Sequence, residues 1–259
     1  MTNSNPDQLF ANSTVLVTGG TRGIGLAVST AFARAGARVA MVYRQNESAA
    51  RQALQALPGE NHLLYAADLA DPAAVKQVLD EAVAAMGKLD VVVNNAGIGE
   101  YHPPDASSYE DWQLAWQATL ATNLLGPANV CFCAAQYMMT SGGGRIVNVS
   151  SRGAFRGEPI KPAYGASKAG LNSLTQSLAV ALAPHGIFVA AVAPGFVNTD
   201  LARERLQGPE GDDIRAQSPL NRVAEPEEVA RAVMFLATPG TEFTTGTIID
   251  VNGASYLRS

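Results

Sequence analysis

Short apolar runs that alternate with longer helical patterns constrain the fold of this chain more than any other feature. Thr14–Thr18 and Arg38–Tyr43 read as strands, and residues 24–35 between them carry apolar side chains at helical spacing. Further strands are predicted at 62–66, 89–93, 145–149, 188–192 and 247–251. Because strands that alternate with helices form βαβ units, the pattern predicts a parallel sheet covered by helices on both faces.

The length and continuity of the chain favour one domain. A chain of 259 residues is ordinary for a single α/β domain, and no linker, repeat or low-complexity tract divides it. We therefore expect a single doubly wound, Rossmann-type domain over 1–259 with a parallel seven-stranded sheet. Residues 200–220 contain Gly208-Pro-Glu-Gly and show no strong period. Their place before the last helix makes them a candidate substrate lid.

Composition excludes several function classes. The formal net charge is −5, so nucleic acid is not an expected partner. The polar N-terminus lacks the regions of a signal peptide, and no apolar run reaches the roughly 18 residues that span a bilayer. We therefore expect a cytoplasmic protein with no membrane partner. A charged fraction of only 16% suits a chain that also buries surface in an oligomer.

The cysteines and histidines give no sign of a metal site. Cys131 and Cys133 lie in a helical stretch and read as two small buried hydrophobic residues. His62, His102 and His185 are scattered and match no zinc spacing. No metal is expected.

A glycine-rich turn follows the first predicted strand. The segment Thr18-Gly-Gly-Thr-Arg-Gly-Ile-Gly25 has the spacing Gly-x-x-x-Gly-x-Gly. Without side chains, the backbone can approach a pyrophosphate, and the helix that follows offers free N–H groups to it. Such a loop alone could be a simple tight turn, but its place between a strand and a helix favours a nucleotide site.

Tyr164 and Lys168 are four positions apart on a predicted helix and therefore share one face. A free tyrosine, with a pKa of about 10, is a poor acid or base at neutral pH. A nearby lysine cation favours the phenolate, so we expect Lys168 to lower the pKa of Tyr164 and make it a usable proton donor. An isolated Tyr-x-x-x-Lys would more often be a solvated surface pair.

Together, these motifs resemble the short-chain dehydrogenase/reductase family. The glycine-rich turn, Asn94-Asn-Ala-Gly97, Tyr164-Gly-Ala-Ser-Lys168 and Pro194-Gly195 follow the family's order and spacing over nearly the whole chain. The resemblance implies an enzyme that transfers a hydride between a nicotinamide cofactor and a carbonyl or secondary alcohol, with Tyr164 as general acid/base. The catalytic group that it implies is Asn123, Ser151, Tyr164 and Lys168.

The resemblance also selects between neighbouring residues. It assigns the hydroxyl that holds the substrate oxygen to Ser151, and the alternative for Ser150 is that it only completes the strand. Asparagine is a poor residue for a helix interior, so Asn123 within a helical stretch invites a reason, the alternative being a surface position.

The remaining implied contacts are to the cofactor. Asp68 would bind the adenine, Asn95 would line the adenosine ribose, and Lys168 would hold the nicotinamide ribose. The full set is Gly19, Thr21, Arg22, Ile24, Arg44, Asp68, Leu69, Asn95, Tyr164, Lys168, Val197 and Thr199. The alternatives are that Asp68 is a helix cap and that Thr199 is the N-cap of the next helix.

The end of the second strand predicts NADP(H) as the cofactor. NAD-binding sheets carry an acidic residue there, whereas this chain has Tyr43 followed by Arg44. No carboxylate repels a 2′-phosphate, and Arg44 can bind it with a planar fork, with Arg22 as a second cation. The alternative is that both arginines are solvated.

Other function classes fit less well. A non-catalytic regulator on the same fold would be expected to lose one of the four polar groups, and all four are present. A serine hydrolase is disfavoured because Gly165-Ala-Ser167-Lys-Ala-Gly170 has the wrong spacing and lies inside a predicted helix.

Within the family, the chain is most similar to the 3-oxoacyl-carrier-protein reductases, through Pro194-Gly-Phe-Val-Asn-Thr-Asp and the tail Val251-Asn-Gly-Ala-Ser-Tyr. That group presents basic side chains where this chain has Thr140-Ser-Gly-Gly-Gly and Pro184-His-Gly, so an acidic carrier protein would find little positive charge. A small ketone or secondary alcohol is at least as good an expectation as a 3-oxoacyl thioester. A homotetramer is expected from the family and from the apolar, lightly charged helices at 109–139 and 163–183.

Pro127 predicts a distortion beside Asn123. A proline inside a helix cannot donate to the carbonyl four residues back, which here belongs to Asn123, and Gly126 adds local freedom. We expect a kink or bulge whose unpaired Asn123 oxygen recruits a water and leads through Lys168 to Tyr164, the side chain only fixing the turn. The alternative is that this oxygen meets bulk solvent.

Overall fold

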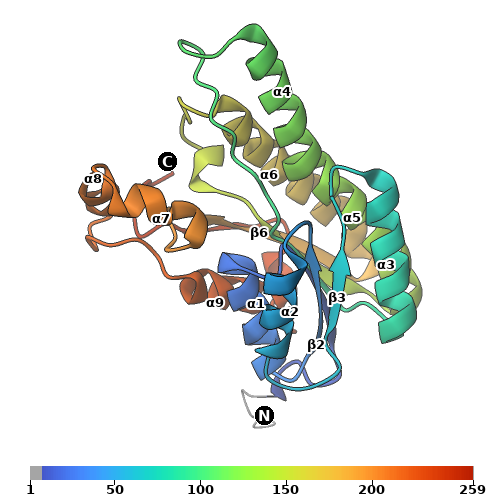
Figure 1. The fold of residues 1–259 in the computed structure, drawn as a ribbon. Coiled ribbons are helices and arrows are strands. Elements are labelled where there is room, and N and C mark those ends of the chain that lie inside the picture. Colours follow the sequence, from blue (N-terminus) through green and yellow to red (C-terminus); the bar gives the residue numbers. More distant parts are fainter. Residues whose placement is uncertain (1–7, 259) are drawn as a thin grey trace.

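The computed structural model describes residues 8–258 and contains one seven-stranded parallel sheet in the order β3-β2-β1-β4-β5-β6-β7 (Figure 1). Its strands are β1 (Thr14–Thr18), β2 (Arg38–Tyr43), β3 (Leu63–Ala66), β4 (Val91–Asn94), β5 (Gly144–Val149), β6 (Ile187–Pro194) and β7 (Ile248–Val251). The predicted strands are all confirmed, with boundaries that move by up to two residues. The doubly wound fold is confirmed as well, because the strand order reverses between β1 and β4.

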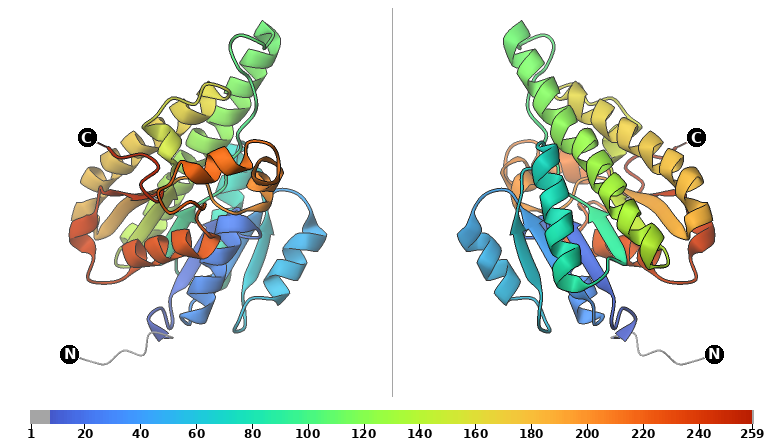
Figure 2. Two further views of the ribbon diagram at one scale, coloured as in Figure 1. Left: turned by 90° about the vertical axis from the view of Figure 1, so that its left-hand side faces the viewer. Right: turned by 90° about the vertical axis from the view of Figure 1, so that its right-hand side faces the viewer.

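Helices cover both faces of this sheet, as Figure 2 shows in two views. The α-helices are α1 (Gly23–Arg34), α2 (Glu47–Gln55), α3 (Pro72–Met86), α4 (Tyr109–Leu120), α5 (Gly126–Ser141), α6 (Pro162–Leu182), α7 (Asp200–Gln207), α8 (Gly211–Ala216) and α9 (Pro226–Ala237). Short turns of other helix types are η2 (Ala121–Leu125), η3 (Arg152–Ala154), η4 (Ala183–His185) and η5 (Glu242–Thr244).

Two apolar cores lie on opposite faces of the sheet. Alternate residues of β1 point to opposite faces, so Val15 and Val17 join the core under α1 and α9, whereas Leu16 joins the core under α3 and α5. All three side chains have no exposed surface. Central strands buried on both sides explain why the sequence shows continuous apolar runs there instead of alternation.

Residues 200–220 form helices that the sequence pattern did not predict. No helical period is visible there, yet the structure forms α7 and α8, which project to one side of the molecule (Figure 1). Only a few apolar side chains anchor them, among them the buried Leu206 and Ile214. Salt bridges such as Arg205 to Glu210, at 2.7 Å, fix the turns instead, so an amphipathic pattern is weak.

The predicted distortion beside Asn123 is confirmed. The helical run that begins with α4 passes through the π-turn η2 before continuing as α5. The N–H of Gly126 donates to the carbonyl of Ala121, five residues back, and Pro127 occupies the first turn of α5. Gly126 also permits a close approach, because a Cβ there would lie 2.9 Å from the carbonyl oxygen of Leu69.

Continuity through η2 corrects one expectation from the sequence. The run Tyr109–Ser141 has 33 residues and a mean hydropathy of 1.2 in its most apolar window, which is long and apolar enough to cross a membrane. It is the single such helix among residues 8–258. Half of that window is buried inside the fold, and a core helix meets the same criteria.

The cysteines are as expected from the sequence. Cys131 has no exposed surface, and burial raises the pKa of its thiol to about 12. Cys133 is half-buried and its thiol pKa is also raised, chiefly by burial. Both therefore remain thiols at neutral pH and pack as small apolar groups.

Candidate active site

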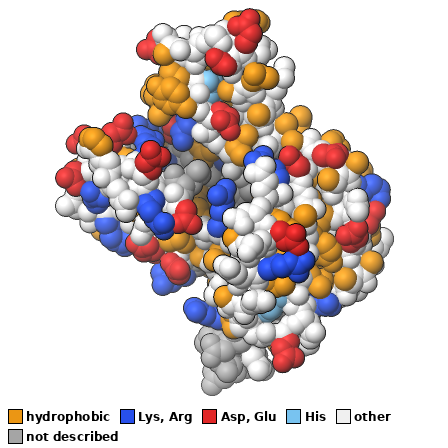
Figure 3. Space-filling view, viewed as in Figure 1, with side chains coloured by type: hydrophobic (Ala, Val, Ile, Leu, Met, Phe, Trp, Pro, Cys, Tyr) orange, Lys and Arg blue, Asp and Glu red, His pale blue; other side chains and the backbone are white. Residues whose placement is uncertain are grey.

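The four predicted catalytic residues meet at the carboxyl edge of the sheet, next to the β1/β4 reversal. Asn123 comes from η2, Ser151 follows β5, and Tyr164 and Lys168 come from the first turns of α6. Figure 3 shows the surface hollowed beside the α7–α8 arm, with Lys and Arg side chains at its margin. In open parallel sheets this edge, at the reversal of strand order, is where ligands bind.

Tyr164 and Ser151 are adjacent in the site. Burial raises the pKa of the Tyr164 phenol, and its hydrogen bond with Ser151 lowers it by a smaller amount. The expectation of a lowered pKa for Tyr164 is therefore wrong, and Lys168 is not among the groups that shift it. The reason is that desolvation disfavours the phenolate more strongly than the neighbouring groups favour it.

Lys168 is buried behind the tyrosine. Its side chain is almost fully enclosed, and Nζ lies 5.8 Å from the centroid of the Tyr164 ring. Nζ donates a 2.8 Å hydrogen bond to the Val149 carbonyl. Burial lowers the pKa of Lys168 to about 8, because one neutral acceptor does not replace the lost hydration of an ammonium.

Asn123 is fully buried, so it is not a surface residue and its oxygen does not meet bulk solvent. Its Oδ1 accepts from the N–H of Ile98 at 2.8 Å, and Nδ2 donates to the Ile98 carbonyl at 2.8 Å and to Ser167 Oγ at 3.1 Å. The side chain thus does more than fix the distorted turn. It ties the segment after β4 to α6.

Asn123 and Lys168 converge over Gly97. A Cβ on Gly97 would lie 3.3 Å from Asn123 Oδ1 and 3.5 Å from Lys168 Nζ. A Cβ at this position would be tight against Asn123 Oδ1 and in ordinary contact with Lys168 Nζ. The Asn-Ala-Gly motif after β4 therefore has a packing reason for its glycine.

The two serines at the end of β5 have different surroundings. Ser150 is buried and its hydroxyl donates to the Lys168 carbonyl at 3.3 Å, which is a structural contact. Ser151 is half-buried, accepts a hydrogen bond from the N–H of Gly153, and contacts Tyr164. This geometry agrees with the choice of Ser151 over Ser150.

The glycine-rich turn leaves a cradle of bare backbone. Gly19 and Gly23 have φ values of +60° and +51°, which side chains rarely adopt. A Cβ on Gly25 would lie only 2.0 Å from the Gly19 carbonyl oxygen. The N-cap residue Arg22 makes no side-chain capping bond, so the first N–H groups of α1 are available to an anion.

Asn95 and Thr199 border this turn. Asn95 Nδ2 donates to the carbonyls of Thr18 and Gly19 at 3.1 Å each, so its amide holds the turn in place. Thr199 stands at the N-cap position of α7 without capping it. Its methyl group lies 3.2 Å from where a Gly23 Cβ would be, which brings the segment after β6 against the start of α1.

We call the predicted nucleotide site between the glycine-rich turn and the ends of β2 and β3 the nucleotide crevice. A hydrogen bond from Gly20 N to the Val42 carbonyl holds the glycine-rich turn beside the end of β2. Arg22 and Arg44 are both exposed, and neither has a carboxylate within 4 Å among residues 8–258. Asp68 is exposed and its Oδ1 accepts from Ala70 N, a local turn contact.

The other predicted cofactor residues differ in their burial. Thr21 and Ile24 are half-buried, whereas Leu69 and Val197 are buried at 5% and 6% exposure. Leu69 follows the local turn of Asp68, and Val197 lies in the segment that leads from β6 to Thr199.

Sequence reasoning missed two buried polar groups that shape this edge. Thr18 Oγ1 accepts from the N–H groups of Asn95 and Ala96, at 3.0 and 3.1 Å, and so fixes the segment after β4. Asn148 accepts from Asn94 and donates to Thr175, which joins β4, β5 and α6. A polar residue within an otherwise apolar strand was the available signal for Asn148.

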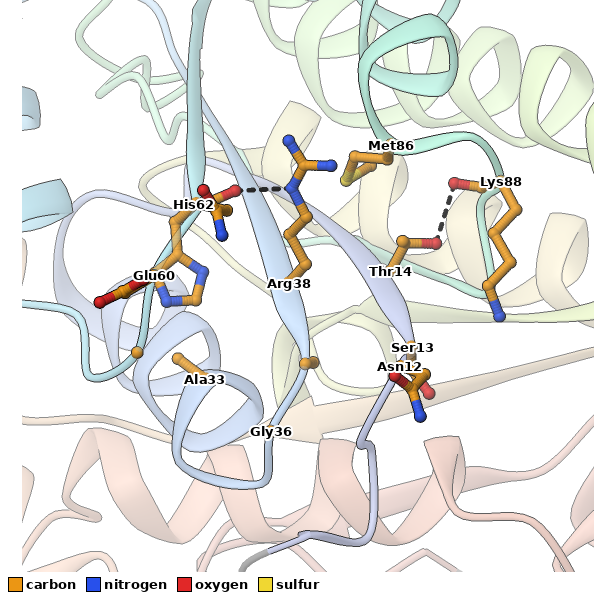
Figure 4. Close-up of a pocket in the computed structure, with 13 residues that line it drawn as sticks. Asn12, Ser13, Thr14, Ala33, Gly36, Arg38, Glu60, His62, Met86 and Lys88 are labelled. Atoms are coloured by element: carbon orange, nitrogen blue, oxygen red, sulfur yellow. Dashed lines mark hydrogen bonds between the residues drawn. The ribbon is translucent and has the colours of Figure 1, made fainter.

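A separate cavity of about 370 Å³ lies at the opposite, amino edge of the sheet (Figure 4). It is lined by Asn12, Gly36, Arg38, His62 and Lys88 together with other residues from the starts of β1 and β2. It shares no residue with the catalytic group. Within the described part of the chain, no cluster of three His, Cys, Asp or Glu side chains could hold a metal ion.

Comparison with known proteins agrees with this geometry. A family model described as enoyl-(acyl carrier protein) reductase matches residues 19–254. A D-threitol dehydrogenase from Mycolicibacterium smegmatis is 36% identical, over 94% of this chain and 92% of that protein. A 3-oxoacyl-[acyl-carrier-protein] reductase FabG from Thermotoga maritima is 36% identical, over 93% of this chain and 97% of that protein.

A solved structure is similar throughout. It is a short-chain dehydrogenase from Burkholderia cenocepacia in complex with NADP, with a TM-score of 0.86 and 34% identity. The match covers 95% of this chain and 98% of that one.

The chain belongs to the short-chain dehydrogenase/reductase family.

Membership in this family makes the chain an oxidoreductase with a nicotinamide cofactor, and the crevice fits that group. A Cβ at Gly25 would fill the cradle of bare backbone, and the first turn of α1 offers uncapped N–H groups.

Replacing Gly25 by alanine should close this cradle. The added methyl group collides with the Gly19 carbonyl, so we expect the dissociation constant for NADPH to rise by at least about tenfold. Quenching of protein fluorescence by NADPH measures it. Gly157→Ala is the control, because a Cβ there meets no atom within 4 Å and should leave binding unchanged. Equal affinities for both variants would contradict the cradle.

The buried Lys168 should make stability depend on pH. Its pKa is about 8 in the folded protein against about 10.5 when unfolded, so between these values the unfolded chain binds the extra proton. Wild-type stability should therefore rise with pH across this window by about 3 kcal/mol relative to Lys168→Met, which lacks the titrating group. Urea unfolding at pH 7.5 and 10 would reveal it. Parallel pH profiles of the two proteins would contradict the assignment.

Proposed function

We propose that this protein is an NADP(H)-dependent reductase of a carbonyl group, working reversibly on the corresponding secondary alcohol. The observation that carries the proposal is the contact of Tyr164 with Ser151 in front of the buried Lys168, at the reversal of the strand order. A phenol, a hydroxyl and an ammonium on one site can bind and protonate a carbonyl oxygen.

Ser151 and Tyr164 act directly on the substrate oxygen. The Ser151 hydroxyl donates a hydrogen bond that orients the carbonyl, and Tyr164 donates the proton that completes the alcohol. NADPH, when bound, supplies the hydride for the carbonyl carbon, so a carbonyl, NADPH and one proton become an alcohol and NADP⁺. Burial keeps the proton on Tyr164 at neutral pH, and the positive charge of Lys168 would favour the phenolate that forms when this proton is donated.

Lys168 and Asn123 restore the proton on Tyr164. Lys168 supplies positive charge behind the phenol as it loses its proton, and its own pKa of about 8 lets it exchange protons near neutral pH. We infer that the Asn123 main-chain oxygen, within the π-turn, holds a water that connects Lys168 to solvent. The missing N–H of Pro127 and the full burial of Asn123 support this route.

NADP(H) is proposed over NAD(H) because of the charges at the end of β2. Arg22 and Arg44 are exposed and lack carboxylate partners among residues 8–258, and Tyr43 stands where a repelling carboxylate would be. A 2′-phosphate would satisfy both guanidinium groups.

The substrate is proposed to be a small ketone or secondary alcohol, or a 3-oxoacyl thioester. The relatives named above act, by their names, on a polyol and on a carrier-bound acyl group. The segment Thr140-Ser-Gly-Gly-Gly lacks the positive charge that an acidic carrier protein would need. A free small molecule is therefore preferred over a carrier-bound one.

We also propose a homotetramer. The helical layer of α4, α5 and α6 exposes large apolar side chains, including Leu114, Leu125, Phe132 and Val180 at 57 to 80% exposure. Burying them between copies of the chain would remove a large apolar surface from water. Sedimentation at micromolar concentration tests this assembly.

The reaction itself is tested by substitution of the acid. With NADPH and a panel of ketones, Tyr164→Phe should lower kcat by about a hundredfold or more, because general acid catalysis is lost while the ring remains. NADPH binding, followed by fluorescence, should persist. Binding of NADPH by the wild-type protein without turnover of any ketone would instead favour the non-catalytic regulator.

The cofactor preference is tested at Arg44. Arg44→Ala should weaken NADPH binding about tenfold and leave NADH binding nearly unchanged, since a hydrogen-bonded arginine–phosphate pair contributes roughly 1.5–3 kcal/mol. Arg34→Ala, at the other end of α1, is the matched control and should change neither. Tighter binding of NADH than of NADPH by the wild-type protein is the outcome that rejects the proposal.

A further inference from the structure

Lys161 is a cation at the reacting centre to which the proposed reaction gives no role. It is the N-cap residue of α6, and its Nζ lies 5.0 Å from the centroid of the Tyr164 ring. A Cβ on Gly99 would lie 3.5 Å from Lys161 Nζ and 3.5 Å from Tyr164 Cδ2. The ammonium therefore stands with the tyrosine over the segment after β4.

This ammonium lacks a partner of opposite charge. Within residues 8–258, Nζ of Lys161 makes no hydrogen bond, and no carboxylate lies within 4 Å of it. Glu158 is near enough to raise the pKa of Lys161, but burial outweighs this effect and lowers it. The Glu158 side chain packs instead over Gly153 and Gly165.

Charges of both signs act on Lys161, Glu158 more strongly than Arg205, but neither is paired with its Nζ. Arg152 and Arg205 stand over the Phe196 ring, at 5.3 and 5.4 Å from its centroid. Arg205 is paired with Glu210, whereas Arg152 donates only to the neutral Ser255 and Gln217. Arg205 further lowers the pKa of Lys161. A half-buried cation in such surroundings is stabilised by an anion from outside the chain.

Resting on the proposed reductase function, we propose that Lys161 binds a carboxylate of the substrate, which makes the substrate an oxo acid and the product a hydroxy acid. The position of Nζ beside the Tyr164 ring sets the distance: the carboxylate and the reacting carbonyl are separated by only a few bonds. A single free ammonium matches a monoanion, and both terminal nitrogens of Arg152 already donate to neutral partners within the chain. A thioester of the same acid lacks the negative charge that Lys161 would bind.

The test compares acids with neutral isosteres. Acetoacetate and levulinate are each measured against their methyl esters with NADPH. For the wild-type protein, kcat/KM should favour the acid of at least one pair by about tenfold or more. Lys161→Met should cut the acid-to-ester ratio about tenfold, mainly through the KM of the acid, and Lys161→Arg should largely keep it.

The ratio separates recognition of the anion from a structural role. Any effect of Lys161 on Tyr164 alone changes both members of a pair equally and leaves the ratio unchanged. Lys76→Met, on the exposed face of α3, is the control that should change nothing. Esters that react as well as acids, or an unchanged ratio in Lys161→Met, would overturn the inference while the reductase function stands. Failure to reduce any of the four compounds or any other ketone would overturn both.

Discussion

Where β1 pairs with β4, the chain reverses the direction in which it adds strands, and the loops on either side of this pair leave toward opposite sides. Parallel pairing places every carboxyl end at one edge, so residues far apart in sequence meet there. The register of Thr18 with Asn94 brings the glycine-rich turn beside the segment that begins at Asn95. Thr18 Oγ1 then fixes that segment through two backbone N–H groups. The nucleotide crevice and the reacting centre both depend on this one pairing.

Asn123 links the segment after β4 to α6. Its amide bonds both backbone groups of Ile98 and the hydroxyl of Ser167, which is adjacent to Lys168. A buried amide with every bond made fixes geometry, because each broken bond would leave a desolvated polar group that costs about 1–3 kcal/mol. The π-turn places this amide where a regular helix would not, since one extra residue per turn rotates the side chain around the axis. Pro127 destabilises the regular helix and so favours the distorted one.

The sequence was sufficient for elements whose signal is local. Apolar runs located all seven strands, and the proline and glycine at 126–127 located the distortion in the helix. It was insufficient where the outcome depends on burial or on distant partners. Tyr164 and Lys168 are correctly paired from their spacing, but the direction of the Tyr164 pKa shift follows from desolvation, which a spacing does not reveal. The helices of 200–220 contain ion pairs such as that of Arg205 with Glu210, and Lys161 is notable only once Gly99 and the Tyr164 ring are seen beside its Nζ.

Burial acts in opposite senses on the two titrating groups of the reacting centre. It raises the pKa of the Tyr164 phenol and lowers that of the Lys168 ammonium to about 8, so the usual order of the two pKa values is reversed. In water, the pKa of tyrosine is lower than that of lysine by about half a unit, whereas here the lysine releases its proton first. In the proposed reaction, Lys168 would therefore return a proton to the Tyr164 phenolate. Tyr164 is the third residue of α6, where the positive end of the helix dipole favours negative charge on the phenol. A substrate anion beside Lys161 would raise the affinity of the whole cluster for protons, and the site would bind its acid and keep Tyr164 protonated in one step.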